Sequence, residues 1–206
     1  LKNDSIYRQG RAVLNVRGEA LDLTRDWRLR KAIEGKSRKG LEVTQTSWVA
    51  YEYQTIDQLR KAGVSVPRPV ANSGHAFLMD YWGEVGLPAP TLHLVELEQR
   101  EARRIYTQTI RDIGVMLRMG IIHGDLSAYN ILYWEGRTAI IDFPQVVSVD
   151  NNPDARAIFG RDVERICGYF NRYGVRADAR VIARDLWAER HEPVVPQTVP
   201  HAFSNQ

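Results

Sequence analysis

The side chains best suited to chemistry lie between Ile121 and Asp142, in the sequence IIHGDLSAYNILYWEGRTAIID. Asp125 is followed five residues later by Asn130, and an apolar segment then leads to a second aspartate, Asp142. This set suits phosphoryl transfer, in which one carboxylate orients the attacking oxygen while an amide oxygen and a second carboxylate hold magnesium. Magnesium prefers hard oxygen ligands and needs few protein groups, so Asn130 and Asp142 would suffice.

The spacing of these residues has a mechanical explanation. Residues 130–134 and 137–141 are predicted to be two strands with Glu135-Gly136 at the turn between them. Pairing of the strands would bring Asn130 and Asp142 to the same open end of a hairpin, beside the loop that carries Asp125. His-Gly-Asp could instead be an ordinary loop, with Asp142 as a strand-end cap. The ordered set of three, flanked by apolar strands, favours a catalytic site.

Length, charge and cysteine content limit the class of protein. The 206 residues are enough for one compact domain or two small lobes. The net charge of +3 only weakly favours an anionic partner. The single cysteine, Cys167, excludes an internal disulfide and a cysteine zinc cluster, and it fits a reducing, cytoplasmic location. No run of about twenty apolar residues is present, so we expect no membrane partner.

The first third of the chain changes from polar to helical character. Residues 1–40 are rich in arginine and lysine, and we interpret them as a solvated basic segment or as a flexible loop that touches nucleotide or a polyanion. Residues 44–62 have helical spacing, with Glu52 on the same face as Trp48 and Ile56. Because an unpaired buried carboxylate is costly, Glu52 must either extend to water or meet a cation.

Short strands and longer helices follow. A short strand is predicted at residues 76–80, and the proline-rich segment 86–90 is interpreted as a rigid connector between lobes. Three helices are expected from the apolar spacing, at residues 96–119, 160–173 and 177–189. The tail at residues 191–206 has three prolines and little periodicity, so we expect a peripheral arm.

With these motifs in view, the sequence resembles the RIO family of atypical protein kinases over roughly residues 1–175. The resemblance rests on four segments: HGDLSAYN at 123–130 for the catalytic loop, IDFPQ at 141–145 for the metal-binding loop, MDYWG at 79–83 with LPAP at 87–90 for the hinge, and Trp48 with Glu52 for helix C. It implies an α+β, two-lobed, protein-kinase-like fold. The expected N lobe is truncated, with antiparallel strands and one helix, and the expected C lobe is mostly helical with a catalytic hairpin.

The resemblance also implies an organisation into three parts. Residues 1–82 would form a partial N lobe that includes helix C and the hinge. Residues 83–190 would form the C lobe with the catalytic and metal-binding loops, and residues 191–206 would be the proline-containing tail.

Roles for the site residues follow from the same resemblance. Asp125 would be the catalytic aspartate, and Asn130 and Asp142 would bind magnesium, with manganese as a substitute. Asp142 would also be catalytic, because in this family the matching residue is thought to accept phosphate as an aspartyl-phosphate intermediate.

Five residues would form the ATP-binding set: Glu52, Met79, Asp80, Trp82 and Ser127. Glu52 would pair with the lysine that binds ATP. The main chain of Asp80 and Trp82 would hold the adenine edge, with Met79 behind it.

Three features distinguish this site from that of ordinary protein kinases. Those enzymes carry a lysine two residues after the catalytic aspartate, whereas this chain has Ser127, so neutralising charge must come from metal and from outside the loop. Pro144 stands where a glycine is usual, and its fixed φ should limit large movements of the metal-binding loop. Few residues separate Asp142 from the next expected helix near Arg161, which leaves no room for a long activation segment.

The chain departs from the family in its first strands. It contains no glycine-rich phosphate loop and no strand of the Val-Ala-Ile-Lys type before the helix that carries Glu52. We therefore expect these residues to be part of a longer kinase. If the protein began at Leu1, we would expect poor ATP affinity and a pseudokinase.

The implied function is that of a RIO-type serine/threonine protein kinase or ATPase that uses ATP and magnesium. A protein substrate or a small ribosomal subunit particle would be its partner. One alternative is a small-molecule phosphotransferase similar to aminoglycoside or choline kinases, which share the three chemical groups. Another is a catalytically weak scaffold that binds RNA or the ribosome. The Phe-Pro-Gln segment and the Pro-Ala-Pro hinge favour the first.

Overall fold

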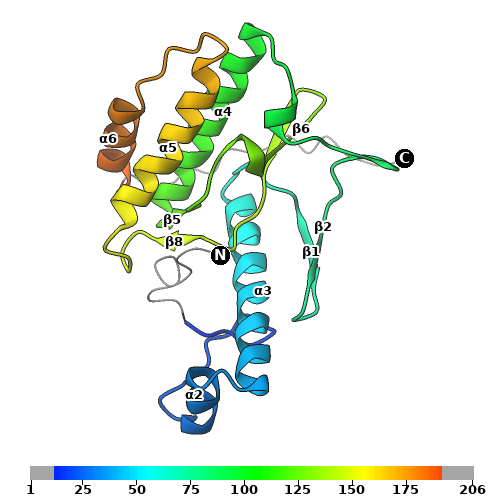
Figure 1. Ribbon diagram of the computed structural model, residues 1–206, viewed down its shortest axis with the longest axis vertical. Coiled ribbons are helices and arrows are strands. Elements are labelled where there is room, and N and C mark those ends of the chain that lie inside the picture. Colours follow the sequence, from blue (N-terminus) through cyan, green and yellow to red (C-terminus); the bar gives the residue numbers. More distant parts are fainter. Residues whose placement is uncertain (1–11, 192–206) are drawn as a thin grey trace.

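The computed structural model describes residues 12–191 and shows an elongated α+β molecule (Figure 1). The tail at residues 192–206, for which a peripheral arm was expected, lies outside the described residues, as do residues 1–11. The fold class predicted from the sequence is confirmed. The helices are α2 (Trp27–Glu34), α3 (Arg38–Lys61), α4 (Gln99–Arg118), α5 (Ala155–Asn171) and α6 (Ala179–Glu189), with short 3-10 turns η1 (Leu92–Leu94) and η2 (Ala128–Asn130).

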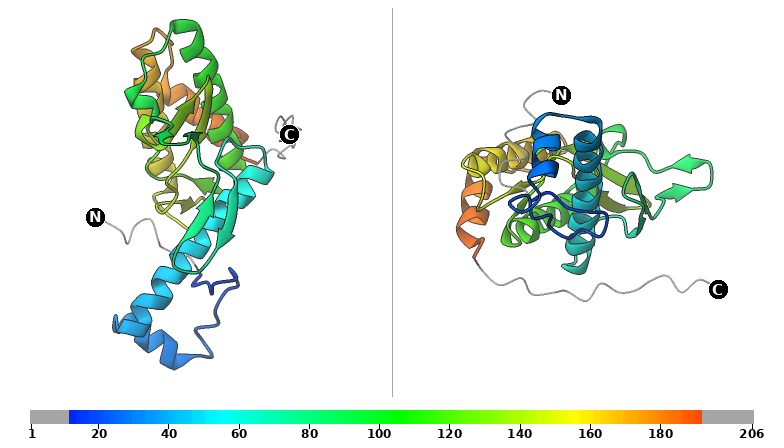
Figure 2. Two further views of the ribbon diagram at one scale, coloured as in Figure 1. Left: turned by 90° about the vertical axis from the view of Figure 1, so that its right-hand side faces the viewer. Right: turned by 90° about the horizontal axis from the view of Figure 1, so that it is seen from below.

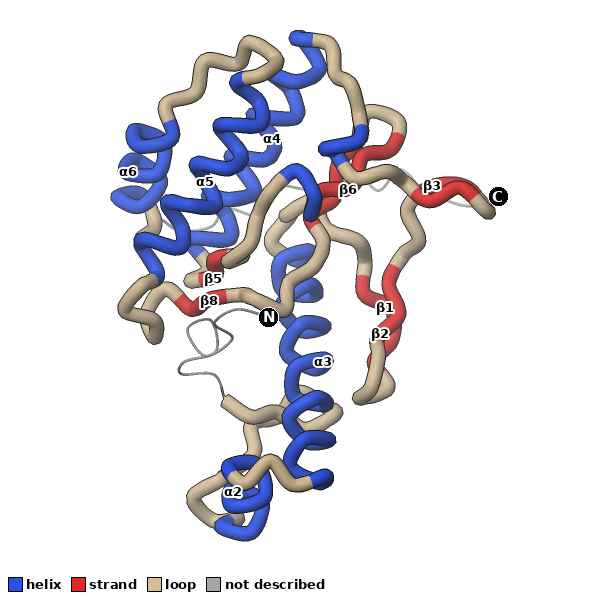
Figure 3. Tube along the Cα trace, viewed as in Figure 1, coloured by secondary structure: helices blue, strands red, loops and turns tan. Residues whose placement is uncertain are grey.

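The strands are short and form two-stranded antiparallel sheets within the described residues. They are β1 (Pro69–Asn72) with β2 (Phe77–Met79), β3 (Gly83–Glu84) with β4 (Leu87–Pro88), β5 (Ile121–Ile122) with β8 (Val147–Ser148), and β6 (Ile131–Trp134) with β7 (Arg137–Ile140). Figure 3 shows these strands distributed between the helices and not gathered into one sheet. The helices therefore supply most of the framework.

Helix α3 connects the two ends of the molecule. Its N-terminal part packs against α2, and both extend away from the remaining elements (Figure 2). Ser37 begins α3 by accepting a hydrogen bond from the Gly40 N–H through its side chain, which satisfies one of the free donors of the first turn. A Cβ at Gly40 would lie 2.0 Å from the Ala32 carbonyl oxygen, so only glycine permits this close approach of α2 and α3.

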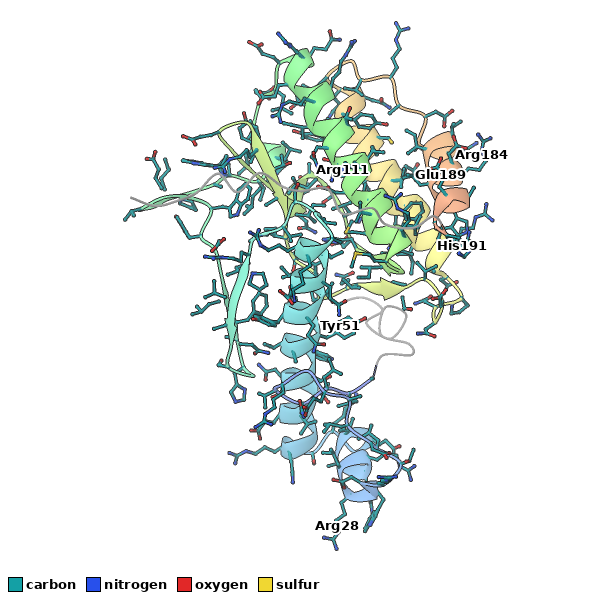
Figure 4. The ribbon with its side chains drawn as sticks, turned by 180° about the vertical axis from the view of Figure 1, so that it is seen from behind. Arg28, Tyr51, Arg111, Arg184, Glu189 and His191 are labelled. Carbon is teal, nitrogen blue, oxygen red and sulfur yellow. The ribbon has the colours of Figure 1, made fainter. Side chains whose placement is uncertain are left out.

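A single cluster of buried apolar residues joins the C-terminal half of α3 to the helical part of the molecule. Ile56 and Leu59 of α3 belong to the same cluster as Ile105 of α4 and Ile166 of α5. Seen from behind, α4, α5 and α6 lie side by side, with the polar side chains of Arg111 and Arg184 on α4 and α6 (Figure 4). This packing holds α5 against the loops that follow α4.

Hydrogen bonds across the molecule fix the hairpin of β6 and β7. The Ile140 N–H donates to the Ser65 carbonyl over 2.8 Å, and the Tyr133 N–H donates to the Pro90 carbonyl over 2.9 Å. The Ser65 N–H in turn donates to the carboxylate of Asp112, which is buried within α4. Two segments that precede α4, at Ser65 and at Pro90, therefore hold the two edges of the hairpin.

Several predicted elements have different boundaries or identities. The helix expected at residues 44–62 begins earlier, at Arg38, because the Ser37 cap lies upstream of the apolar pattern. The segment before it, interpreted as solvated or flexible, contains α2, so from residue 12 to residue 82 the structure has two helices where the sequence predicted one. Trp48 lies on the predicted apolar face but is 40% exposed.

The interpretation of residues 86–90 as a rigid connector is also wrong in part. Leu87–Pro88 pairs with Gly83–Glu84 as a short strand, so residues 83–88 form a small hairpin. A proline at the end of an edge strand loses no ladder hydrogen bond, which explains why the pairing is possible.

No helix within residues 12–191 is long and apolar enough to cross a membrane. Cys167 lies in the core as a free thiol, where it behaves as a small apolar side chain.

Tyr169 of α5 links the helical part to the segment before α4. Its buried hydroxyl donates to the Leu92 carbonyl over 2.7 Å. We expect Tyr169→Phe to lower the free energy of unfolding by about 1 kcal/mol, because a buried donor is removed from this carbonyl. Urea unfolding measures the effect. Tyr81→Phe is the matched control, since that side chain is 62% exposed. Equal losses in the two variants would contradict the assignment.

Candidate active site

The hairpin of β6 and β7 places Asn130 and Asp142 at one end, as predicted. Ile131 pairs with Ile140, and the Ile141 N–H donates to the Asn130 carbonyl over 2.9 Å, which extends the pairing by one step. At the other end, Glu135 and Gly136 have φ values of 47° and 76°. Two successive positive φ angles are typical of a tight hairpin turn, and they match the twist of the strands. The sequence signal for this turn was therefore sufficient.

The side chain of Asn130 is fixed by the loop that carries Asp125. Its Nδ2 donates to the main-chain carbonyl of Asp125 over 2.9 Å. Because the amide nitrogen is used in this way, the Asn130 Oδ1 is left to face a cation. A hard amide oxygen beside the Asp142 carboxylate suits magnesium, which takes most of its remaining ligands from phosphate and water. The donor set therefore fits the metal that the resemblance implies.

Asp142 lies in a left-handed backbone conformation, with φ 68°. This region is unfavourable for most side chains, although aspartate tolerates it better than bulky or β-branched residues. Partial desolvation raises the pKa of the Asp142 carboxyl, and the charge of Asp125 raises it further. The second effect indicates that the two carboxylates lie close enough to interact. A bound cation would relieve this repulsion.

The carboxylate of Glu52 holds the main chain of the loop that follows Asp142. Its Oε1 accepts a hydrogen bond from the Phe143 N–H over 3.0 Å. Phe143 is itself fully buried, so the residue after Asp142 is held by packing and by this carboxylate. The sequence predicted that Glu52 would meet a cation. The contact with Phe143 is a further role that the spacing did not indicate, and it links α3 directly to Asp142.

His123 is buried next to the loop that carries Asp125, and its neutral ring connects two main-chain segments. Its Nε2 is 3.0 Å from the Ile141 carbonyl oxygen, and its Nδ1 accepts from the Asp125 N–H at 3.4 Å. These partners assign the proton to Nε2. Burial lowers the pKa of the ring to about 4, against the opposing effects of the Ile141 carbonyl and the Asp125 charge. The ring therefore ties the Asp125 loop to the strand that leads to Asp142.

Asp162 of α5 anchors the catalytic loop from the other side. Its two carboxylate oxygens accept hydrogen bonds from the N–H groups of Gly124 and Leu126, at 2.8 and 3.1 Å. The neighbouring Arg161 donates to the Gly124 carbonyl over 3.0 Å. Burial raises the pKa of Asp162 to about 7, although the two N–H groups act in the opposite direction. Asp125 is therefore flanked by two main-chain N–H groups held by one carboxylate.

The side chain of Asp125 lies at the edge of an open cavity of about 740 Å³. Ser127 and Asn130 line the same cavity. Arg165 of α5 forms an ion pair with Asp125, with 2.5 Å between Nη1 and Oδ1. A cavity of this size next to the Asp125 carboxylate has room for a small molecule.

The predicted hinge residues form a strand end and the loop after it. Met79 ends β2, and the Asp80 N–H donates to the Arg68 carbonyl over 2.8 Å. The Trp82 carbonyl accepts from the Ala89 N–H, while within residues 12–191 neither the Asp80 carbonyl nor the Trp82 N–H is used in a backbone hydrogen bond. The Asp80 carbonyl and the Trp82 N–H are the groups that the sequence assigned to the adenine edge, and this assignment stays a prediction.

Sequence reasoning identified the residues at the hairpin end but missed those that hold them. His123, Asp162 and Arg165 were not assigned any role. Asp162 carried a usable signal, because it is a carboxylate within the apolar pattern of a helix that includes Val163 and Ile166. The same argument that singled out Glu52 would have found it. Arg165 gave no such signal, since an arginine on an amphipathic helix is ordinary.

The buried ring of His123 should make stability depend on pH. An unfolded chain protonates this group near pH 6.5 and the folded chain only near pH 4, so its stabilising effect is complete above pH 6.5 and is lost as the pH falls toward 4. The difference in unfolding free energy between wild type and His123→Gln should therefore shrink by about 2 kcal/mol from pH 6.5 to pH 5.

Urea unfolding of both proteins at several pH values measures this difference. His75→Gln, in an exposed turn, controls for loss of an imidazole. A wild-type advantage that stayed constant with pH would show that the His123 ring is not held neutral.

Comparison with known proteins assigns a family. The model of the RIO domain matches residues 14–182. The RIO-type serine/threonine-protein kinase Rio1 of Thermoplasma acidophilum is 32% identical over 155 residues, which cover 73% of this chain and 80% of that protein. Rio1 of Haloferax volcanii is 32% identical over 133 residues, or 64% of this chain and 44% of that protein.

The human serine/threonine-protein kinase RIO1 is 32% identical over 150 residues, or 72% of this chain and 26% of that protein. The chain thus spans less than half the length of the Haloferax and human relatives. The matched region nevertheless contains the hairpin of β6 and β7, strands β1 to β4 and helix α5. The chain belongs to the RIO domain family.

Proposed function

We propose that this chain carries the catalytic part of a RIO-type atypical serine/threonine protein kinase or ATPase that uses magnesium-ATP. The observation that carries the proposal is the hairpin end, where Asn130 is fixed to the Asp125 loop and Asp142 adjoins it. These contacts support a site in which the three groups that phosphoryl transfer needs act together. The names of the relatives support the same activity.

Each residue has a definable task in this reaction. The main chain of Asp80 and Trp82 holds the adenine edge, with Met79 beside it, and Asn130 and Asp142 hold the metal. Bound magnesium, or manganese in its place, neutralises charge on the phosphates. Asp125 orients the acceptor hydroxyl and takes up its proton as the acceptor oxygen bonds to the γ-phosphorus. The bond from that phosphorus to the bridging oxygen breaks, and ADP leaves.

Asp142 offers a second route. Its carboxylate oxygen can attack the γ-phosphorus directly, which releases ADP and leaves an aspartyl-phosphate that water or a hydroxyl group later removes. Asp142 lies in a left-handed backbone conformation, and its raised pKa indicates a partly desolvated carboxylate. Both properties suit a nucleophile. Hydroxylamine-labile phosphate on the protein would distinguish this route from direct transfer.

The partner is a protein substrate or a small ribosomal subunit particle, as the family resemblance implies. A small-molecule acceptor is the second candidate, because the cavity beside Asp125 has the size of a small-ligand site.

The deciding experiment incubates the chain with labelled ATP and magnesium and measures ADP release, autophosphorylation and transfer to a panel of proteins, sugars and amino alcohols. Fast transfer to a sugar or amino alcohol without autophosphorylation would reverse the order of the candidates. No turnover with any acceptor or water would overturn the kinase assignment.

Removal of the Asp125 carboxylate should separate binding from chemistry. We expect Asp125→Ala to lower turnover by about 1,000-fold, because the group that positions the acceptor and accepts its proton is lost. Affinity for magnesium-ATP should change by less than about 3-fold. Single-turnover kinetics and titration calorimetry measure the two quantities. A parallel loss of ATP binding would place Asp125 among the nucleotide ligands.

Asp142→Asn should affect both quantities. The amide is a weaker magnesium ligand and a poor nucleophile, so we expect magnesium-ATP affinity to fall at least about 10-fold, or about 1.4 kcal/mol, and turnover to fall as well. The same substitution at Asp185, on the exposed side of α6, is the matched control. Wild-type single-turnover rates in Asp142→Asn would refute the assigned role.

A further inference from the structure

Arg165 is the cation nearest to the proposed catalytic aspartate, and the catalytic loop itself has Ser127 where ordinary kinases have lysine. We propose that Arg165 of α5 replaces that lysine: it holds Asp125 before the reaction and stabilises the charge on the phosphoryl group during transfer. This inference rests on the proposed function and names a further catalytic residue for it.

The position of Arg165 on α5 supports the assignment. Asp162 lies one turn earlier and accepts the N–H groups of Gly124 and Leu126, so this face of the helix is turned toward the catalytic loop. The turn η2, which follows Asp125, contacts α5. Residues three apart on a helix share a face, so Arg165 must point in the same direction as Asp162. The anchoring of the loop thereby fixes the distance between Arg165 and Asp125.

The charges of the residues that line the cavity also support this role for Arg165. Asp125 is the one carboxylate among the described residues that line it, whereas Arg165 and Arg172 both contribute guanidinium groups. The guanidinium of Arg172 stacks over the Tyr169 ring, 4.8 Å from its centre, and its Nε donates to the Tyr169 carbonyl. Arg165 is therefore the cation in direct contact with the reacting carboxylate. A cavity with excess positive charge favours an anionic ligand.

The geometry of a guanidinium allows both tasks. The ion pair uses Oδ1 of Asp125 and Nη1 of Arg165, which leaves the second carboxylate oxygen for the acceptor hydroxyl and four further N–H groups on the arginine. Arginine stays protonated at all physiological pH values and binds planar arrays of oxygens. In the transition state, negative charge spreads over the three equatorial oxygens of the phosphoryl group. Arg165 can therefore bridge Asp125 and that group while the acceptor loses its proton to Asp125.

The test removes the cation from α5 and restores one from the loop. Arg165→Gln should lower kcat by about 100-fold, as removal of one preorganised charge typically does, with the KM for ATP changed by less than about 3-fold. Arg165→Lys should retain more activity than Arg165→Gln. The double variant Arg165→Gln, Ser127→Lys should recover at least about 10-fold of the lost kcat. Arg156→Gln, at the exposed start of the same helix, is the matched control.

A binding measurement separates charge stabilisation from a purely structural role. ADP with aluminium fluoride and magnesium mimics the transferring phosphoryl group, so Arg165→Gln should weaken binding of this complex by about 100-fold while binding of ADP alone stays near the wild-type value. Equal binding of the mimic by wild type and Arg165→Gln would overturn the inference. A kcat of Arg165→Gln equal to that of wild type would overturn it too. A fall in kcat with a lowered unfolding midpoint and no rescue by Ser127→Lys would also overturn it. Absence of wild-type turnover would reject the proposed function, and this inference with it.

Discussion

The site depends on one buried carboxylate. The carboxylate of Asp162 accepts hydrogen bonds from the N–H groups of Gly124 and Leu126 at the same time, and so fixes the main chain on both sides of Asp125. A carboxylate with 2% exposure would be strongly destabilising without such donors. The two hydrogen bonds satisfy the buried carboxylate of Asp162, and the same two bonds hold the loop in place. The loop therefore cannot move independently of α5.

A second set of contacts joins the loop to the metal-binding residues. His123 bridges Asp125 to Ile141, and Asn130 bridges the same loop to the hairpin through the Asp125 carbonyl. Glu52 brings in α3 through the Phe143 N–H. Helices α3 and α5, from the two halves of the chain, thus both reach the open end of the hairpin, where Asn130 and Asp142 lie. Because the apolar cluster is shared between these halves, their packing and the position of the catalytic groups are coupled.

The short connection after Asp142 has consequences for substrate binding. Residues 143–154 contain β8, which pairs with β5, and then lead directly into α5. An activation segment that could support an extended peptide is therefore absent from this stretch. The cavity beside Asp125 is bounded instead by α5 and by the exposed ring of Tyr129, which stacks on His93. A molecule that approaches the Asp125 carboxylate must pass between α5 and Tyr129.

The sequence alone determined the hairpin and its polar end. Strand period, the Glu-Gly turn and the placement of Asn130 and Asp142 are local, so spacing was sufficient to predict them. The family resemblance added the hinge and the fold class. Only the tertiary structure decided which groups support Asp125, because Asp162 and Arg165 are 37 and 40 residues away along the chain and reach it through the packing of α5. The same holds for Glu52, whose contact with Phe143 spans 91 residues. Apolar spacing can show that Glu52 and Asp162 lie on buried helix faces, but the partners they meet at such separations depend on the path of the whole chain.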